Sequence, residues 1–113
     1  DPTTCRLLGI VTTNNNPTVQ GWRVEQNGTV LFEALPGSYI SFFGEIDEVV
    51  DVSDGPLPLT LVGDPATGWS NGFLSLPFDP GTPITTFRPT VPFQQADIDI
   101  NCAARVGIVT PLP

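Results

Sequence analysis

Proline and glycine recur so closely along this chain that they leave almost no room for an α-helix. The sequence of 113 residues contains 13 Pro and 11 Gly. Proline removes a backbone donor and glycine lowers helix propensity, so both residues interrupt helices. No run of about 11 residues free of them carries apolar side chains at the helical period. The best remaining helix candidate, Glu45–Val52, contains three β-branched valines and therefore favours a strand.

The same prolines and glycines divide the chain into short β-like segments. We therefore predict an all-β fold over residues 1–113, a single small β-sandwich or jelly-roll-like antiparallel barrel of about eight or nine strands. Strands are expected at Cys5–Thr12, Val19–Glu25, Thr29–Leu35, Tyr39–Phe43, Ile46–Val52, Leu57–Val62, Gly72–Phe78, Ile84–Arg88 and Ala96–Val109. The last of these segments is long enough to bend near Cys102. Turns are expected at residues 14–17, 36–37, 53–56, 63–65 and 79–81.

The clearest local signal is the dipeptide Asn27-Gly28 between two β-prone runs. Both residues accept the positive φ angles of a type I′ turn, so the sequence predicts a two-residue β-hairpin here. With Thr29, the same residues form an Asn-x-Thr sequon, which makes Asn27 a candidate glycosylation site on an exposed turn. The turn alone also explains these residues without any glycan.

Charge excludes two classes of partner. The chain has 12 Asp and Glu against four Arg, no Lys and no His, for a net charge of −8. Such a charge repels phosphate backbones and anionic lipid heads, so we expect no nucleic acid partner and no membrane insertion. The 40% hydrophobic content, which includes seven Phe, indicates a packed core rather than an acidic disordered chain.

The cysteines indicate an oxidising compartment. Cys5 and Cys102 are the two cysteines, and the chain has no His that could join them in a metal site. We predict a disulfide between them, with bonds to neighbouring molecules as the alternative. The chain contains no Met and opens with Asp1-Pro2, which favours removal of a preceding segment. A cleaved signal peptide is the ordinary explanation, and a recombinant or proteolytic fragment is the alternative. With the cysteines, this favours a secreted, extracellular or cell-surface protein.

The composition also removes most catalytic chemistry. Without His or Lys, and with both cysteines in a disulfide, the common nucleophile and base pairs cannot be built. Carboxylate pairs remain, as in glycoside hydrolysis, but an acidic sandwich offers such pairs by accident. No Asp-Thr-Gly or Asp-Ser-Gly triplet occurs. We therefore expect a protein that is not an enzyme and needs no cofactor, calcium excepted.

Calcium is a candidate ligand because oxygen-bearing side chains alternate near the end of the chain. Asp97, Asp99 and Asn101 fall on one face of the expected strand, and their spacing is similar to the start of an EF-hand loop. However, Cys102 stands where that loop requires glycine. A second acidic stretch covers residues 45–54. A solvated acidic surface that aids solubility explains both stretches as well.

Three aromatic residues could stack on a sugar ring: Trp22, Tyr39 and Trp69. Trp22 lies within an expected strand and is more simply a core residue. Trp69 lies in the expected loop 66–72, where an exposed indole often marks a contact site. Trp69 is therefore the candidate ligand-binding residue of a carbohydrate module, and local packing is the equal alternative.

Several expected strands carry apolar side chains on both of their faces. Residues 30–32 and 73–74 do so, as does the C-terminal stretch 106–113. Strands of this kind need cover on both faces, from loops or from another subunit. The termini are also β-prone, at residues 7–11 and 107–109. We expect a non-catalytic structural subunit of an extracellular fibre, pilus-like appendage, coat or surface layer, a homo-oligomer that associates through strand addition. The alternative is a secreted carbohydrate-binding or adhesin module that uses Trp69 and loop carboxylates.

Overall fold

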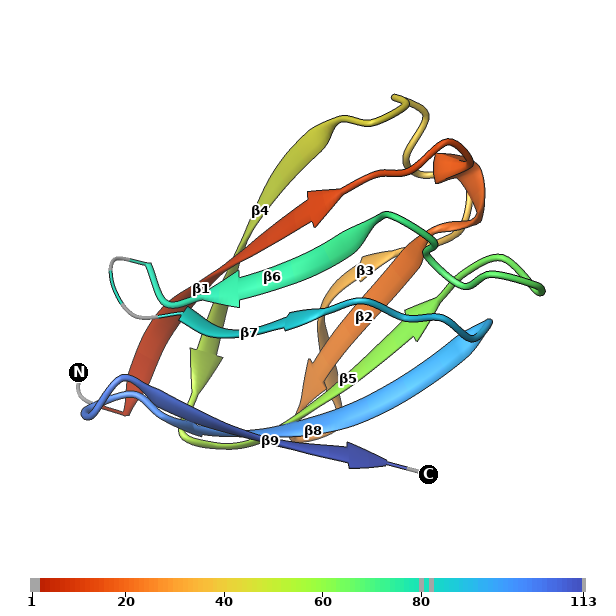
Figure 1. The fold of residues 1–113 in the computed structure, drawn as a ribbon. Coiled ribbons are helices and arrows are strands. Elements are labelled where there is room, and N and C mark those ends of the chain that lie inside the picture. Colours follow the sequence, from red (N-terminus) through yellow and green to blue (C-terminus); the bar gives the residue numbers. More distant parts are fainter. Residues whose placement is uncertain (1–2, 80, 82, 113) are drawn as a thin grey trace.

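The computed structural model describes residues 3–79, 81 and 83–112. In this part of the chain two antiparallel sheets pack face to face (Figure 1). The first sheet has the strand order β4-β1-β6-β7, with β1 (Thr4–Thr12), β4 (Glu45–Ser53), β6 (Phe73–Pro77) and β7 (Pro83–Phe87). The second has the order β3-β2-β5-β8-β9, with β2 (Gly21–Gln26), β3 (Thr29–Ala34), β5 (Gly55–Val62), β8 (Phe93–Asn101) and β9 (Val106–Leu112). The predicted all-β sandwich is confirmed.

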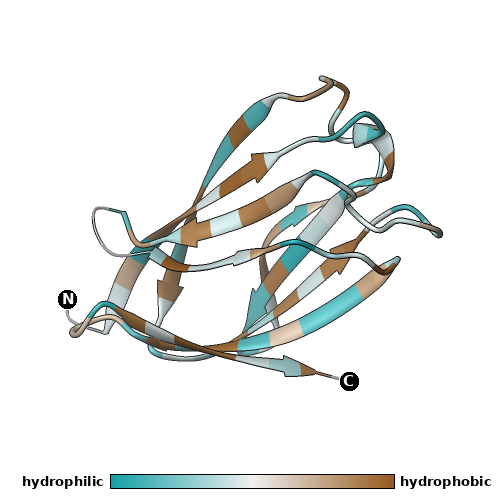
Figure 2. Ribbon diagram, in the orientation of Figure 1, coloured by the Kyte–Doolittle hydropathy of each residue, from teal (hydrophilic) through white to brown (hydrophobic). Residues whose placement is uncertain are grey.

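Side-chain alternation builds the core between the sheets. In β5, Leu57, Leu59 and Leu61 are at most 1% exposed, whereas the residues between them point outward and are only half-buried. Hydrophobic and hydrophilic residues alternate in the same way along other strands (Figure 2). Each fully buried aliphatic side chain stabilises the fold by about 1.5–3 kcal/mol. The period of two in the sequence therefore determines which face of each strand enters the core.

Strand β1 runs through the interior of the first sheet. It pairs with β4 from Thr4 to Thr12, and its last residues also pair with β6. Gly9 faces Trp22 of the opposite sheet, and a Cβ at this position would lie 2.5 Å from the Trp22 ring. Of the two terminal segments expected to exchange strands, this one lies inside a sheet, whereas β9 lies at a sheet edge.

The predicted hairpin between β2 and β3 is confirmed. Asn27 has a φ of 53° and Gly28 has a φ of 78°, as a type I′ turn requires. Gln26 and Thr29 pair directly on either side of the turn. The preceding strand begins later than expected, because Val19 belongs to a short 3-10 helix, η1 (Pro17–Val19), and β2 starts at Gly21.

The strand predicted at Tyr39–Phe43 is wrong. Residues 35–44 form the loop that joins β3 to β4. Positive φ angles of 101° at Gly37 and 51° at Phe43 turn the backbone away from any ladder. The Tyr39 side chain turns inward, where its hydroxyl oxygen accepts a hydrogen bond of 2.7 Å from Trp22 Nε1. A contact with the core thus replaces the strand pairing that the residue propensities favoured.

The single long strand predicted at Ala96–Val109 is also wrong. The segment forms the hairpin β8–β9, with its turn over residues 102–105. Arg105 adopts a φ of 53°, an uncommon conformation for a residue other than Gly, Asn or Asp. The bend expected near Cys102 is therefore present, but it is a complete reversal of the chain, which the sequence does not indicate because the turn contains no Gly or Pro. Of the turn expected at 79–81, residue 80 lies outside the described residues.

Four strands form the sheet edges: β4 and β7 in the first sheet, β3 and β9 in the second. Near one side of the sandwich β7 approaches β9, where Gly107 packs against the Ile84 side chain. On the other side β3 approaches β4. No helix in the described ranges is long and apolar enough to span a bilayer.

Candidate functional site

The predicted disulfide joins the two ends of the described chain. Cys5 at the start of β1 bonds Cys102 at the β8–β9 turn, with 5.4 Å between the Cα atoms and a sequence separation of 97. Asp54 stabilises this junction, because its Oδ1 accepts a 2.7 Å hydrogen bond from the Cys102 N–H and its own N–H donates to the Thr3 carbonyl. The bond lies within the chain, and it ties the first sheet to the second.

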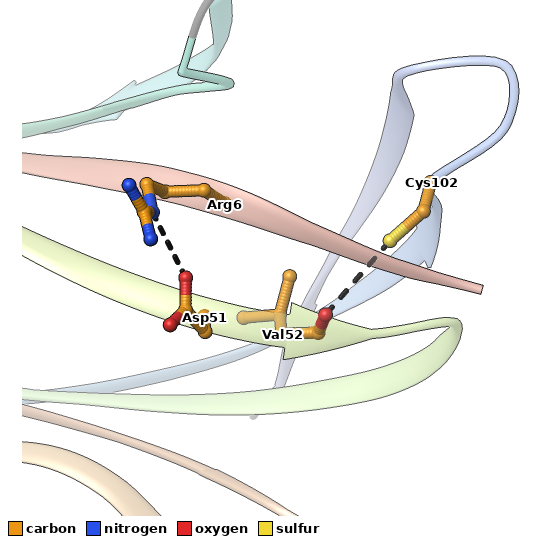
Figure 3. Close-up of polar contacts among 4 residues, drawn as sticks. All are labelled: Arg6, Asp51, Val52 and Cys102. Carbon is orange, nitrogen blue, oxygen red and sulfur yellow. Dashed lines mark hydrogen bonds and ion pairs between the residues drawn. The ribbon is translucent and has the colours of Figure 1, made fainter. Parts of the chain in front are cut away.

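A cavity opens beside the disulfide, and we call it the disulfide-end cavity. It measures about 680 Å³ and is lined by Cys5, Arg6, Asp51, Asp79, Ala103 and Arg105, among others. Figure 3 shows Arg6 of β1 and Asp51 of β4 pointing toward one another, with 2.9 Å between Arg6 Nε and Asp51 Oδ1. This hydrogen bond and the Asp51 charge raise the pKa of Arg6. Two of the four arginines of the chain therefore lie at one cavity.

Figure 3 also marks the approach of Cys102 Sγ to the Val52 carbonyl oxygen, at 4.0 Å. A sulfur in a disulfide carries no hydrogen, so this approach is a packing contact and not a hydrogen bond. It shows that the disulfide rests on the end of β4, within the side of the molecule that holds the cavity.

The prediction that Trp69 is an exposed stacking residue is wrong. Trp69 is fully buried, and its Nε1 donates a 2.7 Å hydrogen bond to the Val62 carbonyl oxygen. Trp22 and Tyr39 are buried as well, at 1% and 6% exposure. The local-packing interpretation thus holds for Trp69. Gly63 leaves space beside the Trp69 ring, since a Cβ at Gly63 would lie 2.8 Å from a ring carbon, and the sequence does not reveal this arrangement.

Buried polar side chains near Trp69 are used in the fold. Asn14 Nδ2 donates to the Trp69 carbonyl, and the Asn14 N–H donates to Gln20 Oε1 at 3.0 Å. Gln20 Nε2 in turn donates to the Thr12 carbonyl. These bonds satisfy backbone groups where the chain leaves β1, and they give the cluster a structural role.

The residues predicted to bind calcium do not gather into a cage. Asp97 and Asp99 lie on the outer face of β8, while Asn101 Oδ1 accepts a hydrogen bond from the Ala104 N–H in the following turn. Asp97 Oδ1 is buried without a hydrogen-bond partner. Across the described residues no group of three or more His, Cys, Asp or Glu is arranged to hold a metal ion. The turn around Asn101 therefore uses its oxygen for backbone geometry.

Two other polar turns are exposed. Asn27 lies at the tip of the β2–β3 hairpin, where a glycan would meet no protein, and glycosylation there stays a prediction. Asp64 accepts hydrogen bonds from the backbone N–H groups of Ala66 and Thr67, and the bond from Ala66 is the main cause of its lowered pKa. These bonds form a turn of the Asx type, so the lowered pKa marks local structure.

Strand β9 at the edge of the second sheet carries no charged residue and exposes apolar side chains, beside Asp97 and Asp99 on the outer face of β8. Val106, Ile108 and Leu112 are 47%, 62% and 44% exposed. Phe93 of the neighbouring strand β8 is 55% exposed. This exposure agrees with the expectation that the C-terminal strand is apolar on both faces. One face of β9 packs inward, and the other has no cover within the described chain.

The loop over residues 35–44, which we call the tip loop, carries a second apolar surface. Leu35, Ile40, Phe42 and Phe43 are 61%, 75%, 66% and 67% exposed. Sequence reasoning missed this loop because its residues have high strand propensity. The signal that marks it is a run without any charged residue between Gly37 and Gly44.

Comparison with models of protein families, with curated proteins and with solved structures found no match.

Proposed function

We propose that this protein is a non-catalytic structural subunit of an extracellular assembly, and that copies associate through the edge and outer face of β9. The observation that carries the proposal is an edge strand with three exposed apolar side chains and no charged residue. Unpaired backbone groups on such an edge add a strand from another copy, and the apolar side chains fill the contact beside it.

The other edges are protected in ways that β9 is not. Strand β4 carries Glu45, Asp47, Glu48 and Asp51, which repel a second copy. Strand β7 is short and begins with Pro83, and β3 is short and contains Glu33. Natural sheets limit edge pairing with charges, prolines and short strands. In β9, Pro111 and the Ile84 contact at Gly107 leave the middle of the strand as the accessible part.

Export is the second part of the proposal. A disulfide that closes 97 residues is compatible with an extracellular location, because such bonds persist in oxidising compartments. The net charge of −8 keeps isolated copies soluble until they meet an apolar contact. The carbohydrate-binding alternative loses support, because the three aromatic residues expected to stack on sugars are all buried.

Light scattering with size-exclusion chromatography and negative-stain microscopy tests the proposal. We expect wild-type protein to form oligomers, and Ile108→Lys to reduce their mean mass, because it places a charge on the β9 surface. Ile108 is 62% exposed, so this change leaves the fold intact. Val49→Lys is the matched control, since Val49 is 54% exposed on the acidic edge β4 and should not alter the mass. A wild-type protein that stays monomeric at high concentration overturns the proposal.

A further inference from the structure

We infer that the tip loop of one copy docks in the disulfide-end cavity of a second copy, so that copies stack head to tail. This inference rests on the proposed self-association and adds a second contact, distinct from β9, with its own occupant. Both partners in the contact are present on every chain.

The tip loop is apolar and uncharged, as buried contacts are, yet its large side chains are exposed. Ile40, Phe42 and Phe43 are each at least 66% exposed. No charged residue occurs over residues 35–44. Contiguous exposed apolar groups of this kind mark interaction sites in soluble proteins. Hydrophobic residues in this loop stand at the top of Figure 2, away from the core.

Hydrogen bonds with Thr13 anchor the end of the tip loop that precedes β4. Thr13 Oγ1 donates a 2.7 Å hydrogen bond to the Ser41 carbonyl and accepts a 2.8 Å bond from the Gly44 N–H. The Thr13 N–H donates to the Gly44 carbonyl at 2.8 Å. These bonds hold the backbone on both sides of the Phe pair, which lowers the ordering cost of a contact made there.

Phe43 adds an independent sign of function. Its φ of 51° is a strained conformation for a large residue, and the strain turns the ring into solvent rather than into the core. Strained backbone persists where the surrounding structure enforces it, and it clusters at binding sites. Joining β3 to β4 does not require a positive φ or an exposed ring at Phe43.

The disulfide-end cavity has the chemistry that two phenylalanine rings prefer. Arg6, Arg105 and the two cysteines of the disulfide are among its lining residues. The Arg6 guanidinium is held in place by its ion pair with Asp51. Arginine over an aromatic face and sulfur at an aromatic edge are both favourable contacts. The chain already uses the first of these, because Arg88 lies 4.4 Å from the centre of the Phe73 ring.

Charge also favours this pairing over a contact between two tip loops. Glu45 follows the tip loop directly, and Glu48 lies close enough to raise the pKa of Tyr39 by its charge, although burial is the larger cause. Two tip loops would bring these carboxylates together. In the cavity the two arginines offset Asp51 and Asp79, so it is a nearly neutral place on a molecule of charge −8.

The two surfaces lie at opposite ends of the molecule. Strand β1 connects them, since Cys5 at its start holds the cavity and Thr13 just after its end holds the tip loop (Figure 1). Its nine residues span about 30 Å. A contact between opposite ends is heterologous, so successive copies extend into a row, or into a ring where the rotation between copies closes.

A mixing experiment tests the inference in the Ile108→Lys background, which weakens the β9 contact. The tip variant is Phe42→Ser with Phe43→Asn, because Asn tolerates positive φ. The cavity variant is Ala103→Glu, at an exposed turn position. Each variant alone should raise the dissociation constant of head-to-tail growth about tenfold or more. A one-to-one mixture should form dimers and nothing larger, because each pair retains one intact contact.

Each result bears on one proposal. If tip and cavity variants associate as their parent does, or if their mixture forms no dimer, the head-to-tail inference is wrong while association through β9 stands. If the wild-type protein forms no oligomer, the proposed function itself fails. Circular dichroism of both variants, together with Val49→Ser on the exposed edge β4 as a control, checks that the sandwich is intact.

Discussion

At the scale of single residues, the hydrogen bond between Trp22 and Tyr39 connects the core to the tip loop. Trp22 Nε1 donates to the Tyr39 hydroxyl at 2.7 Å, and both side chains are buried. An indole N–H in the core needs an acceptor, and no backbone carbonyl takes that role here. This bond therefore fixes the base of the tip loop from within.

We predict that Tyr39→Phe destabilises the protein by about 1–3 kcal/mol, because it leaves the buried Trp22 N–H unpaired. The pKa of Tyr39 is raised, chiefly by burial. A raised pKa means that the native state resists ionisation, so stability is complete below the unfolded pKa near 10 and falls as the pH rises above it. Urea unfolding of both proteins from pH 7 to 11 measures the two effects.

The Tyr39→Phe variant should not show the fall in the free energy of unfolding that Tyr39 causes at alkaline pH. The difference in stability between wild type and variant should therefore narrow as the pH rises. A constant difference across this range would show that Tyr39 ionises freely in the native state.

Local chemistry made some single residues predictable. Asn27 and Gly28 determine their turn by their own conformational preferences, and the odd-and-even pattern of β8 directed Cys102 toward the core. Trp69 was not predictable, because its environment comes from the Val62 carbonyl and from the close approach of Gly63, which the neighbours of Trp69 in sequence do not specify. Whether an aromatic side chain in a loop is exposed depends on which distant segments pack against it.

At the scale of elements, periodicity predicted most strands and failed where tertiary contacts decided. Strands β4 and β5 follow their apolar alternation closely. Residues 39–43 have strand propensity but become the tip loop, because Tyr39 bonds to the core and Thr13 holds the backbone. The β8–β9 turn contains no turn-forming residue, so its position follows from the disulfide and from Asp54.

The spacing between β1 and β2 across the core gives a test at this scale. We predict that Gly9→Ala destabilises the protein by about 1–3 kcal/mol, because the new methyl group would lie 2.5 Å from a Trp22 ring carbon. Gly44→Ala is the matched control, since the nearest atom to its Cβ is 3.5 Å away. Thermal unfolding compares the two variants, and equal melting temperatures would contradict the packing described here.

At the scale of the whole molecule, one covalent bond joins the two sheets. The Cys5–Cys102 bond connects an interior strand of the first sheet to the hairpin at the edge of the second. Sequence predicted the partners, because the chain contains only two cysteines. It did not predict the cavity beside the bond, which needs the β1, β4 and β8–β9 segments in place.

We predict that Cys5→Ser combined with Cys102→Ser lowers the free energy of unfolding by roughly 4–5 kcal/mol, less any strain released, because a loop of 97 residues is no longer closed in the unfolded chain. That loss is a large share of the total stability of a small domain. Denaturant unfolding measures it, and wild-type protein under reducing conditions should match the variant. A midpoint unchanged by either treatment would refute this account.

The same bond has a mechanical consequence. Tension applied to the ends of the chain passes through the two sulfur atoms and bypasses the enclosed segment, whose ends are separated by 97 in sequence. At about 3.5 Å per extended residue, the bond withholds roughly 340 Å of contour from stretching. A subunit pulled from its chain ends would therefore hold its length under load, and a reducing environment would make the same subunit extensible.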